Sequence, residues 1–100
     1  MSVQIPIDRD KVASFCRHHR IRKLALFGSV LRDDFRPDSD VDTLVEFEPG
    51  IAVGFIRLAS IELLLSEILE RKVDLRTPAD LSRYFRQEVL QSAEVQYVQR

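Results

Sequence analysis

The apolar run LALF at positions 24–27 is the feature that most constrains the fold, because no polar residue interrupts it. A short run of this kind is typical of a strand that is covered on both faces, and such strands lie near the centre of a sheet. The segment 21–28 is therefore expected to form a central strand. Gly28 and Ser29 follow at its end, where the Gly-Ser pair predicts a turn.

Helical and strand-like patterns alternate along the rest of the chain. In chain order we expect a helix at about 9–19 with Asp8 as its N-cap, the strand at 21–28, a short helix at 29–34, a strand at 41–47, a helix at 55–70, a strand at 72–77 and a helix at 78–92. The tail 94–100 fits either an edge strand or an extension of the last helix. The order α-β-α-β-α-β-α predicts an α/β (α+β) fold, in which helices flank a small mixed sheet.

Most of the remaining apolar and aromatic residues have a simple structural interpretation. Cys16 lies on the apolar face of the first helix and is expected in the core, whereas His18 should be solvated and His19 half-buried, since neither has a metal-ligand partner at the right spacing. Helix packing is predicted for the following residues: Phe55, Leu81, Tyr84, Phe85, Val89 and Leu90. No aromatic platform for nucleic-acid bases is evident.

The composition predicts one ordinary globular domain spanning residues 1–100, with 45% hydrophobic and 31% charged residues. A net charge of -1 provides no positive field for a phosphate backbone, which disfavours a direct nucleic-acid substrate. The single cysteine excludes an intramolecular disulfide, and the N-terminus lacks the apolar region of a secretory signal. The apolar stretch 55–69 is interrupted by charges, so no membrane span and a cytoplasmic location are expected.

Three aspartates occupy positions where a strand is expected to begin or continue. Asp40 and Asp42 are two residues apart, so an extended chain directs both side chains to one face. Aspartate is depleted from strands, yet Asp74 repeats the anomaly between Val73 and Leu75. A shared Mg²⁺ site is one interpretation, because Mg²⁺ prefers oxygen ligands and uses one or two carboxylates with phosphate oxygens and water. The alternative is a turn cap followed by an exposed strand residue.

Gly28 and Ser29 stand where a strand gives way to a short helix. The free N–H groups and positive dipole of a helix N-terminus favour an anion such as a triphosphate. A simple strand-to-helix turn, with Ser29 as the N-cap, is the alternative.

Together these segments resemble a known family. Gly28-Ser29, Arg32, the stretch SDVD at 39–42 and the stretch VDL at 73–75 resemble the GSxxR…SDxD…VDL pattern of the minimal nucleotidyltransferases, small relatives of the DNA polymerase β superfamily. The resemblance extends over nearly the whole chain and implies the palm-like nucleotidyltransferase fold. Two positions depart from the pattern: Asp33 stands where many members have glycine, and Thr43 where an aliphatic residue is common.

The resemblance also implies roles for individual residues. Catalysis and the binding of Mg²⁺, two ions in all, would fall to three carboxylates: Asp40, Asp42 and Asp74. Asp74 would act as the base or as a ligand of the second ion. Nucleotide binding would fall to four residues: Gly28, Ser29, Arg32 and Ser39. For Arg32 an exposed ion pair is an equal alternative. The implied reaction is the transfer of a nucleotidyl group from ATP to a hydroxyl.

Members of about this length resemble the antitoxin half of HEPN/MNT toxin–antitoxin pairs. The implied function is that of a protein adenylyltransferase, which moves AMP from ATP to a hydroxyl, most plausibly a tyrosine, of a HEPN-type RNase toxin held in a hetero-oligomer. The R-x4-6-H pattern of such toxins does not occur in this sequence, so the toxin would be another polypeptide. Two alternatives stay open: a non-catalytic antitoxin that neutralises its toxin by complex formation, and nucleotide transfer to a small molecule.

Overall fold

A four-stranded mixed sheet organises the computed structural model, which describes residues 3–99. The strands are β1 (Ile21–Phe27), β2 (Val41–Phe47), β3 (Val73–Arg76) and β4 (Glu94–Val98), in the order β3-β2-β1-β4. β1 is antiparallel to both of its neighbours, and β2 and β3 are parallel. The mixed sheet and the central position of the first strand are confirmed.

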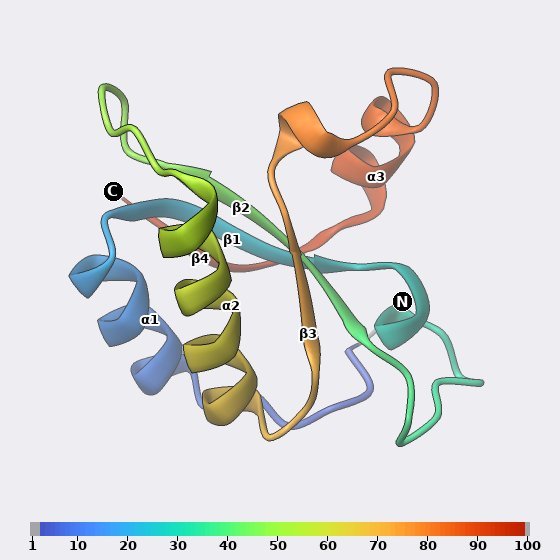
Figure 1. Cartoon of the computed structure of the whole chain (residues 1–100). Coiled ribbons are helices and arrows are strands. Elements are labelled where there is room, and N and C mark those ends of the chain that lie inside the picture. The colour runs from blue at the N-terminus through green and yellow to red at the C-terminus, as the bar shows by residue number, and fades with distance from the viewer. Residues whose placement is uncertain (1–2, 100) are drawn as a thin grey trace.

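Two helices cover one face of this sheet, α1 (Arg9–His18) and α2 (Phe55–Leu69) (Figure 1). α2 forms the crossover that a parallel pair requires, because it connects β2 to β3. The apolar core lies between these helices and the sheet, and its fully buried members include Val12, Leu24, Leu26, Val45, Ile61 and Leu65. No helix within residues 3–99 is both long enough and apolar enough to span a membrane.

β1 is buried on both of its faces, as its apolar sequence predicts. Leu24 and Leu26 belong to the core beneath the helices. Ala25 points to the other face, where Leu44 and Val95 flank it on the two neighbouring strands, and it is equally buried. Because the side chain of Ala25 is small, its two neighbours in the sheet are enough to bury it without a helix on this face.

The residues of β2 alternate between the two faces of the sheet. Val41, Thr43 and Val45 are buried on the helix side, and Asp42 faces the opposite side. The hydroxyl of Thr43 donates a hydrogen bond to the carbonyl oxygen of Val41 at 3.2 Å. A threonine is therefore accommodated in this core because its hydroxyl has an acceptor.

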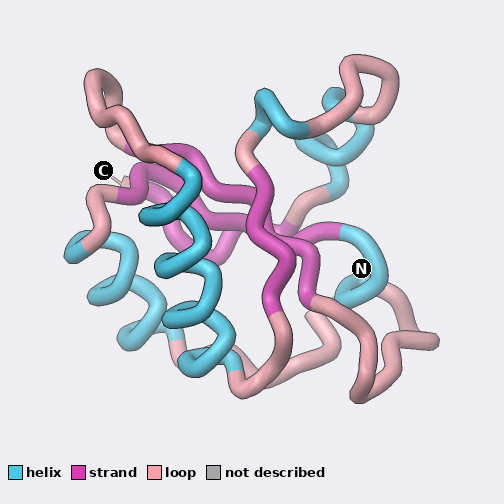
Figure 2. The backbone as a smooth tube through the Cα atoms, viewed as in Figure 1, coloured by secondary structure: helices cyan, strands magenta, loops and turns pink. Residues whose placement is uncertain are grey.

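The single helix predicted at 78–92 is wrong. The chain instead forms a 3-10 turn, η2 (Pro78–Asp80), a loop, and a seven-residue helix, α3 (Arg86–Ser92), as Figure 2 shows. The Asp80 carboxylate accepts hydrogen bonds from the backbone N–H and the hydroxyl of Thr77, at 3.1 and 3.0 Å. This local capping box stabilises the start of η2, and the turn ends at Leu81, which takes an extended conformation.

The break in the helix changes which side chains are buried. Phe85 is 61% exposed and Leu90 40%, although a continuous helix would have turned both inward. Tyr84 and Phe55, also predicted to pack, are 78% and 89% exposed. The packing prediction is wrong for these four side chains.

Several smaller predictions are confirmed. The Asp8 carboxylate caps α1 by accepting a hydrogen bond from the backbone N–H of Lys11 at 3.2 Å. Cys16 is fully buried, and this burial raises the pKa of its thiol to about 12. His18 is exposed and His19 half-buried, with its ring 4.6 Å from that of Phe15. The tail forms an edge strand, the first of its two alternatives, although Arg100 lies outside the described residues.

Candidate active site

Two of the three candidate carboxylates lie side by side on the sheet face that α1 and α2 leave uncovered. Asp42 on β2 is the register partner of Asp74 on β3, and on its other side it is the partner of Phe27 on β1. Residues paired across neighbouring strands direct their side chains to the same face. The sheet therefore presents one row formed by Phe27, Asp42 and Asp74.

Asp42 is the most perturbed of the three carboxyl groups. Partial burial raises its pKa, and the neighbouring Asp74 carboxylate raises it further. Arg76 lowers the pKa of Asp42, Asp40 raises it, and Arg32 lowers it by the smallest amount. The charges of Asp40 and Asp74 therefore both act on Asp42, which is the electrostatic environment of a shared carboxylate site.

Cationic side chains form ion pairs with the other two carboxylates, those of Asp40 and Asp74. Arg76 donates a hydrogen bond to Asp74 at 3.1 Å, and the Lys72 ammonium lies 4.0 Å from the Asp40 carboxylate. All four side chains are at least one-third exposed, so these ion pairs are weak and exchangeable. Within residues 3–99, no three Asp, Glu, His or Cys side chains are grouped closely enough to hold a metal ion. A metal-binding role for the three aspartates stays a prediction.

α2 fixes the backbone of β3 on both sides of Asp74. The Ser66 hydroxyl accepts a hydrogen bond from the N–H of Val73 at 3.0 Å, and the Glu62 carboxylate accepts one from the N–H of Leu75 at 2.8 Å. An edge strand would otherwise leave these N–H groups unpaired. The two helix side chains therefore set the position from which Asp74 projects, and the sequence pattern gave no sign of them.

Gly28 brings the turn after β1 into contact with Asp42. Its φ of +75° is a conformation that side chains with a Cβ rarely adopt, and a Cβ at this position would collide with the Asp42 carboxylate. The glycine is thus required both by the turn and by the close approach of the carboxylate. This contact joins the Gly-Ser turn and the aspartate row into one site.

The short helix predicted at 29–34 is instead the four-residue 3-10 helix η1 (Gly28–Leu31). Ser29 lies inside it and is not its N-cap, a position taken by Phe27. One turn has almost no macrodipole, so an anion here would be bound by individual N–H and hydroxyl groups rather than by a helix field.

Arg32 and Ser39 lie in the loop that joins η1 to β2. The exposed Arg32 side chain is 3.7 Å from the Asp34 carboxylate, which matches the ion-pair alternative, yet its charge also lowers the pKa of Asp42. The backbone N–H of Ser39 donates a hydrogen bond to the carbonyl oxygen of Arg36 at 3.0 Å and so closes the turn before Asp40. The structure places Arg32 within electrostatic reach of Asp42 and Ser39 immediately before Asp40.

A groove of about 410 Å³ opens between η1 and α3. The sequence predicted site residues on its η1 side but none on its α3 side. One wall includes Gly28 and Arg32, two of the residues expected to bind nucleotide, and the other includes Phe85 and Glu88. The volume is within the usual range for small-molecule sites. The only sequence signal for the second wall was the spacing of Phe85, which was interpreted as packing.

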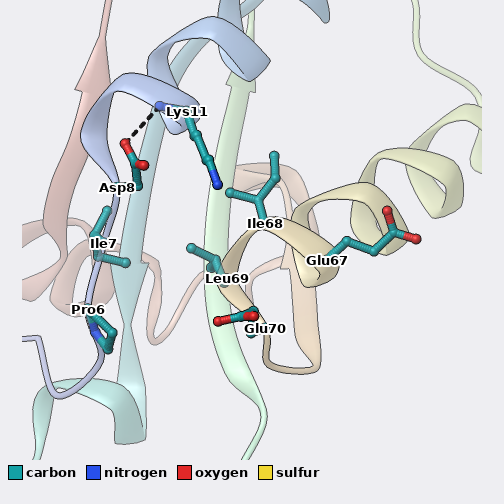
Figure 3. Close-up of a pocket in the computed structure, with 8 residues that line it drawn as sticks. All are labelled: Pro6, Ile7, Asp8, Lys11, Glu67, Ile68, Leu69 and Glu70. Carbon is teal, nitrogen blue, oxygen red and sulfur yellow. Dashed lines mark hydrogen bonds between the residues drawn. The ribbon is translucent and has the colours of Figure 1, made fainter.

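A second cavity, of about 770 Å³, is lined by none of the residues of this row and lies between residues 6–11 and the end of α2 (Figure 3). Asp8 already serves as the cap of α1. Figure 3 shows the side chain of Glu67 directed away from those of Asp8 and Glu70. These carboxylates do not converge, so this cavity offers no arrangement for acid–base or metal chemistry.

Sequence comparison relates this chain to a known family and to known proteins. Residues 9–96 match the family model described as the nucleotidyltransferase domain. The protein adenylyltransferase MntA of Thermococcus cleftensis is 35% identical over 78 residues, which are 78% of this chain and 75% of that protein. The proposed protein adenylyltransferase MJ0126 of Methanocaldococcus jannaschii is 37% identical over 60 residues, 59% of this chain. That alignment spans 58% of MJ0126, less than two thirds of its length.

Solved structures share the fold. A proposed minimal nucleotidyltransferase, 36% identical, superposes with a TM-score of 0.69 over 85% of each chain. A toxin–antitoxin crystal structure with AMP-PNP gives a TM-score of 0.74 at 20% identity, over 94% of this chain and 76% of that chain. A complex of tri-AMPylated Shewanella oneidensis HEPN toxin with MNT antitoxin gives 0.65 at 20% identity, over 91% and 70%. By its sequence match and its fold, this chain belongs to the nucleotidyltransferase domain family.

Proposed function

We propose that this chain is a Mg²⁺-dependent protein adenylyltransferase and the antitoxin of a HEPN-type toxin, which it neutralises by transferring AMP from ATP to a toxin hydroxyl, that of a tyrosine. The names of the relative MntA and of the AMPylated toxin complex support this function. The observation that carries it is the row of Asp42 and Asp74 with Gly28 against the Asp42 carboxylate. We also propose that residues 1–100 act as one domain, and the apolar core that α1, α2 and the sheet share supports this.

The donor set fits Mg²⁺ chemically. Three carboxylates with no nitrogen or sulfur ligand suit a hard divalent cation that takes its remaining ligands from phosphate oxygens and water. Asp40 and Asp42 would hold the ion, and Asp74 would join them once it exchanges Arg76 for the new cation. Bound Mg²⁺ supplies charge neutralisation at the phosphates.

The protein's own residues would position the substrates. Gly28 and Ser29 would seat the triphosphate with backbone N–H and hydroxyl groups, and Arg32 would add a cation at its exposed side. In the reaction, the acceptor oxygen forms a bond to the α-phosphorus, the bond from that phosphorus to the bridging oxygen breaks, and pyrophosphate leaves. Asp74 lies on β3, an edge strand of the sheet, and would accept the proton of the acceptor hydroxyl.

Intact-mass measurement of the toxin tests this function. The toxin encoded beside this chain, incubated with the chain, ATP and Mg²⁺, should gain the mass of one or more AMP groups. Asp42→Asn should abolish the adduct while the two proteins still co-elute on size exclusion. If the toxin is silenced equally by Asp42→Asn, with no mass change under any nucleotide, the non-catalytic antitoxin is correct instead.

A further inference from the structure

One wall of the groove between η1 and α3 contains the candidate triphosphate turn, and the other contains an exposed aromatic ring. Gly28, in the first wall, contacts the Asp42 carboxylate, so this wall adjoins the aspartate row. Phe85, the N-cap residue of α3, and Glu88 line the second wall. A nucleotide whose phosphates lie beside Gly28 would therefore extend its base toward these two side chains.

We propose that Phe85 is the stacking platform for the nucleobase, and that the Glu88 carboxylate accepts a hydrogen bond from the exocyclic amino group of adenine. This inference rests on the proposed function and deepens it, since it assigns the residues that bind the base. Base stacking needs a flat apolar ring that is open to solvent before the nucleotide arrives. Phe85 meets this requirement, being 61% exposed and yet a wall of the groove.

Hydrogen bonds fix the backbone around Phe85. Its N–H donates to the carbonyl oxygen of Ser82 at 3.0 Å, and its carbonyl oxygen accepts from the N–H of Val89 at 2.9 Å. The Arg86 guanidinium donates to the carbonyl oxygen of Leu81 at 3.0 Å and so closes the preceding loop. The backbone that carries the ring therefore loses little conformational freedom when a base stacks on it.

The neighbouring aromatic residue has a different environment. Tyr84 is 78% exposed, but it is not among the residues that line the groove, and its ring and hydroxyl are in contact with the Arg83 guanidinium. Both aromatic side chains are exposed, but only that of Phe85 lines the groove. Tyr84 provides a matched control for Phe85.

The chemistry of Glu88 favours a base that donates at its exocyclic group. An ionised carboxylate only accepts hydrogen bonds, and the amino groups of adenine, cytosine and guanine donate them. Glu88 can therefore accept a hydrogen bond from any of these three bases. Stacking on Phe85 favours the larger purines over cytosine, so the groove is expected to bind ATP and GTP more tightly than CTP.

Calorimetry on the full chain with Mg²⁺ tests this assignment, with ATP, CTP, GTP and inorganic tripolyphosphate as probes. Phe85→Ala should weaken ATP binding roughly tenfold or more and leave tripolyphosphate binding unchanged, because stacking energy is lost only with a base. Phe85→Tyr should restore ATP binding, and Tyr84→Ala should not alter it. Glu88→Ala should weaken ATP binding and should not weaken tripolyphosphate binding, because only the base has an amino group that donates to Glu88.

Three outcomes would overturn the inference. If Phe85→Ala binds ATP as tightly as the unaltered chain, the ring is not the platform, and the proposed function is unaffected. If Phe85→Ala weakens ATP and tripolyphosphate equally, the residue acts on the turn and not on the base. If neither probe binds the unaltered chain, the proposed function falls, and this inference with it.

Discussion

Replacing Gly28 by alanine is expected to damage both folding and catalysis, and Gly50→Ala provides the matched control. Both glycines have a positive φ, +75° and +84°. A Cβ at Gly50 would meet no atom within 4 Å, whereas a Cβ at Gly28 would collide with the Asp42 carboxylate. The two variants therefore share the backbone cost and differ in the contact with Asp42.

The two contributions have different sizes. An alanine in the left-handed region costs about 1–2 kcal/mol. Moving Asp42 off its rotamer adds about 0.5–1.5 kcal/mol in Gly28→Ala alone. For a domain of this size, each kcal/mol lowers the midpoint of thermal unfolding by roughly 4–8 °C. A displaced catalytic carboxylate is also expected to slow AMP transfer by on the order of a hundredfold.

Urea and thermal unfolding measure the first effect, and toxin modification followed by intact mass measures the second. Gly28→Ala should be less stable than Gly50→Ala and nearly inactive, and Gly50→Ala should keep its activity. Equal stability losses, combined with normal AMP transfer by Gly28→Ala, would show that the close approach of Gly28 to Asp42 has no role in the site.

Four further substitutions test the aspartate row and its surroundings. The raised pKa of Asp42 means that the folded chain disfavours its ionised form, so its contribution to stability is greatest below pH 3.8 and falls as pH rises through the raised pKa. Asp42→Asn should therefore unfold at a higher temperature than the unaltered chain at pH 7, and this difference should vanish near pH 3. Ser66→Ala leaves the N–H of Val73 unpaired and should cost about 1–3 kcal/mol, with faster hydrogen exchange along β3, whereas Glu62→Gln keeps an acceptor and should be nearly neutral in the same assay. Thr43→Val replaces a satisfied buried hydroxyl by a methyl group and should change the free energy of unfolding by less than about 1 kcal/mol in urea titration.

The sequence predicted which face of its strand each aspartate occupies, because the cause is local. The period of two in a strand places Asp42 on the face opposite Val41 and Thr43, and Asp74 repeats this pattern between two buried residues. The apolar run of β1 identified the central strand for a similar reason. The order of the strands depends on tertiary packing and had no signal in the sequence.

The second wall of the groove was not predictable in this way. The spacing of Phe85 and Val89 fits a continuous helix, and a helix would have buried both. The chain leaves the helical conformation at Leu81 and resumes it only at Arg86, so Phe85 lies at the start of α3, where it lines the groove. The contact of Gly28 with Asp42 also joins residues from different strands, so the sequence predicted the turn but not the contact.

Crystallography with Mn²⁺ in place of Mg²⁺, together with a non-hydrolysable ATP analogue, tests the central claim most directly. The account predicts an anomalous scattering peak at the carboxylates of Asp40 and Asp42, with the triphosphate against Gly28 and with Asp74 released from Arg76. A triphosphate bound elsewhere, or Mn²⁺ absent from these carboxylates in a crystal that contains the nucleotide, would contradict the proposed active site.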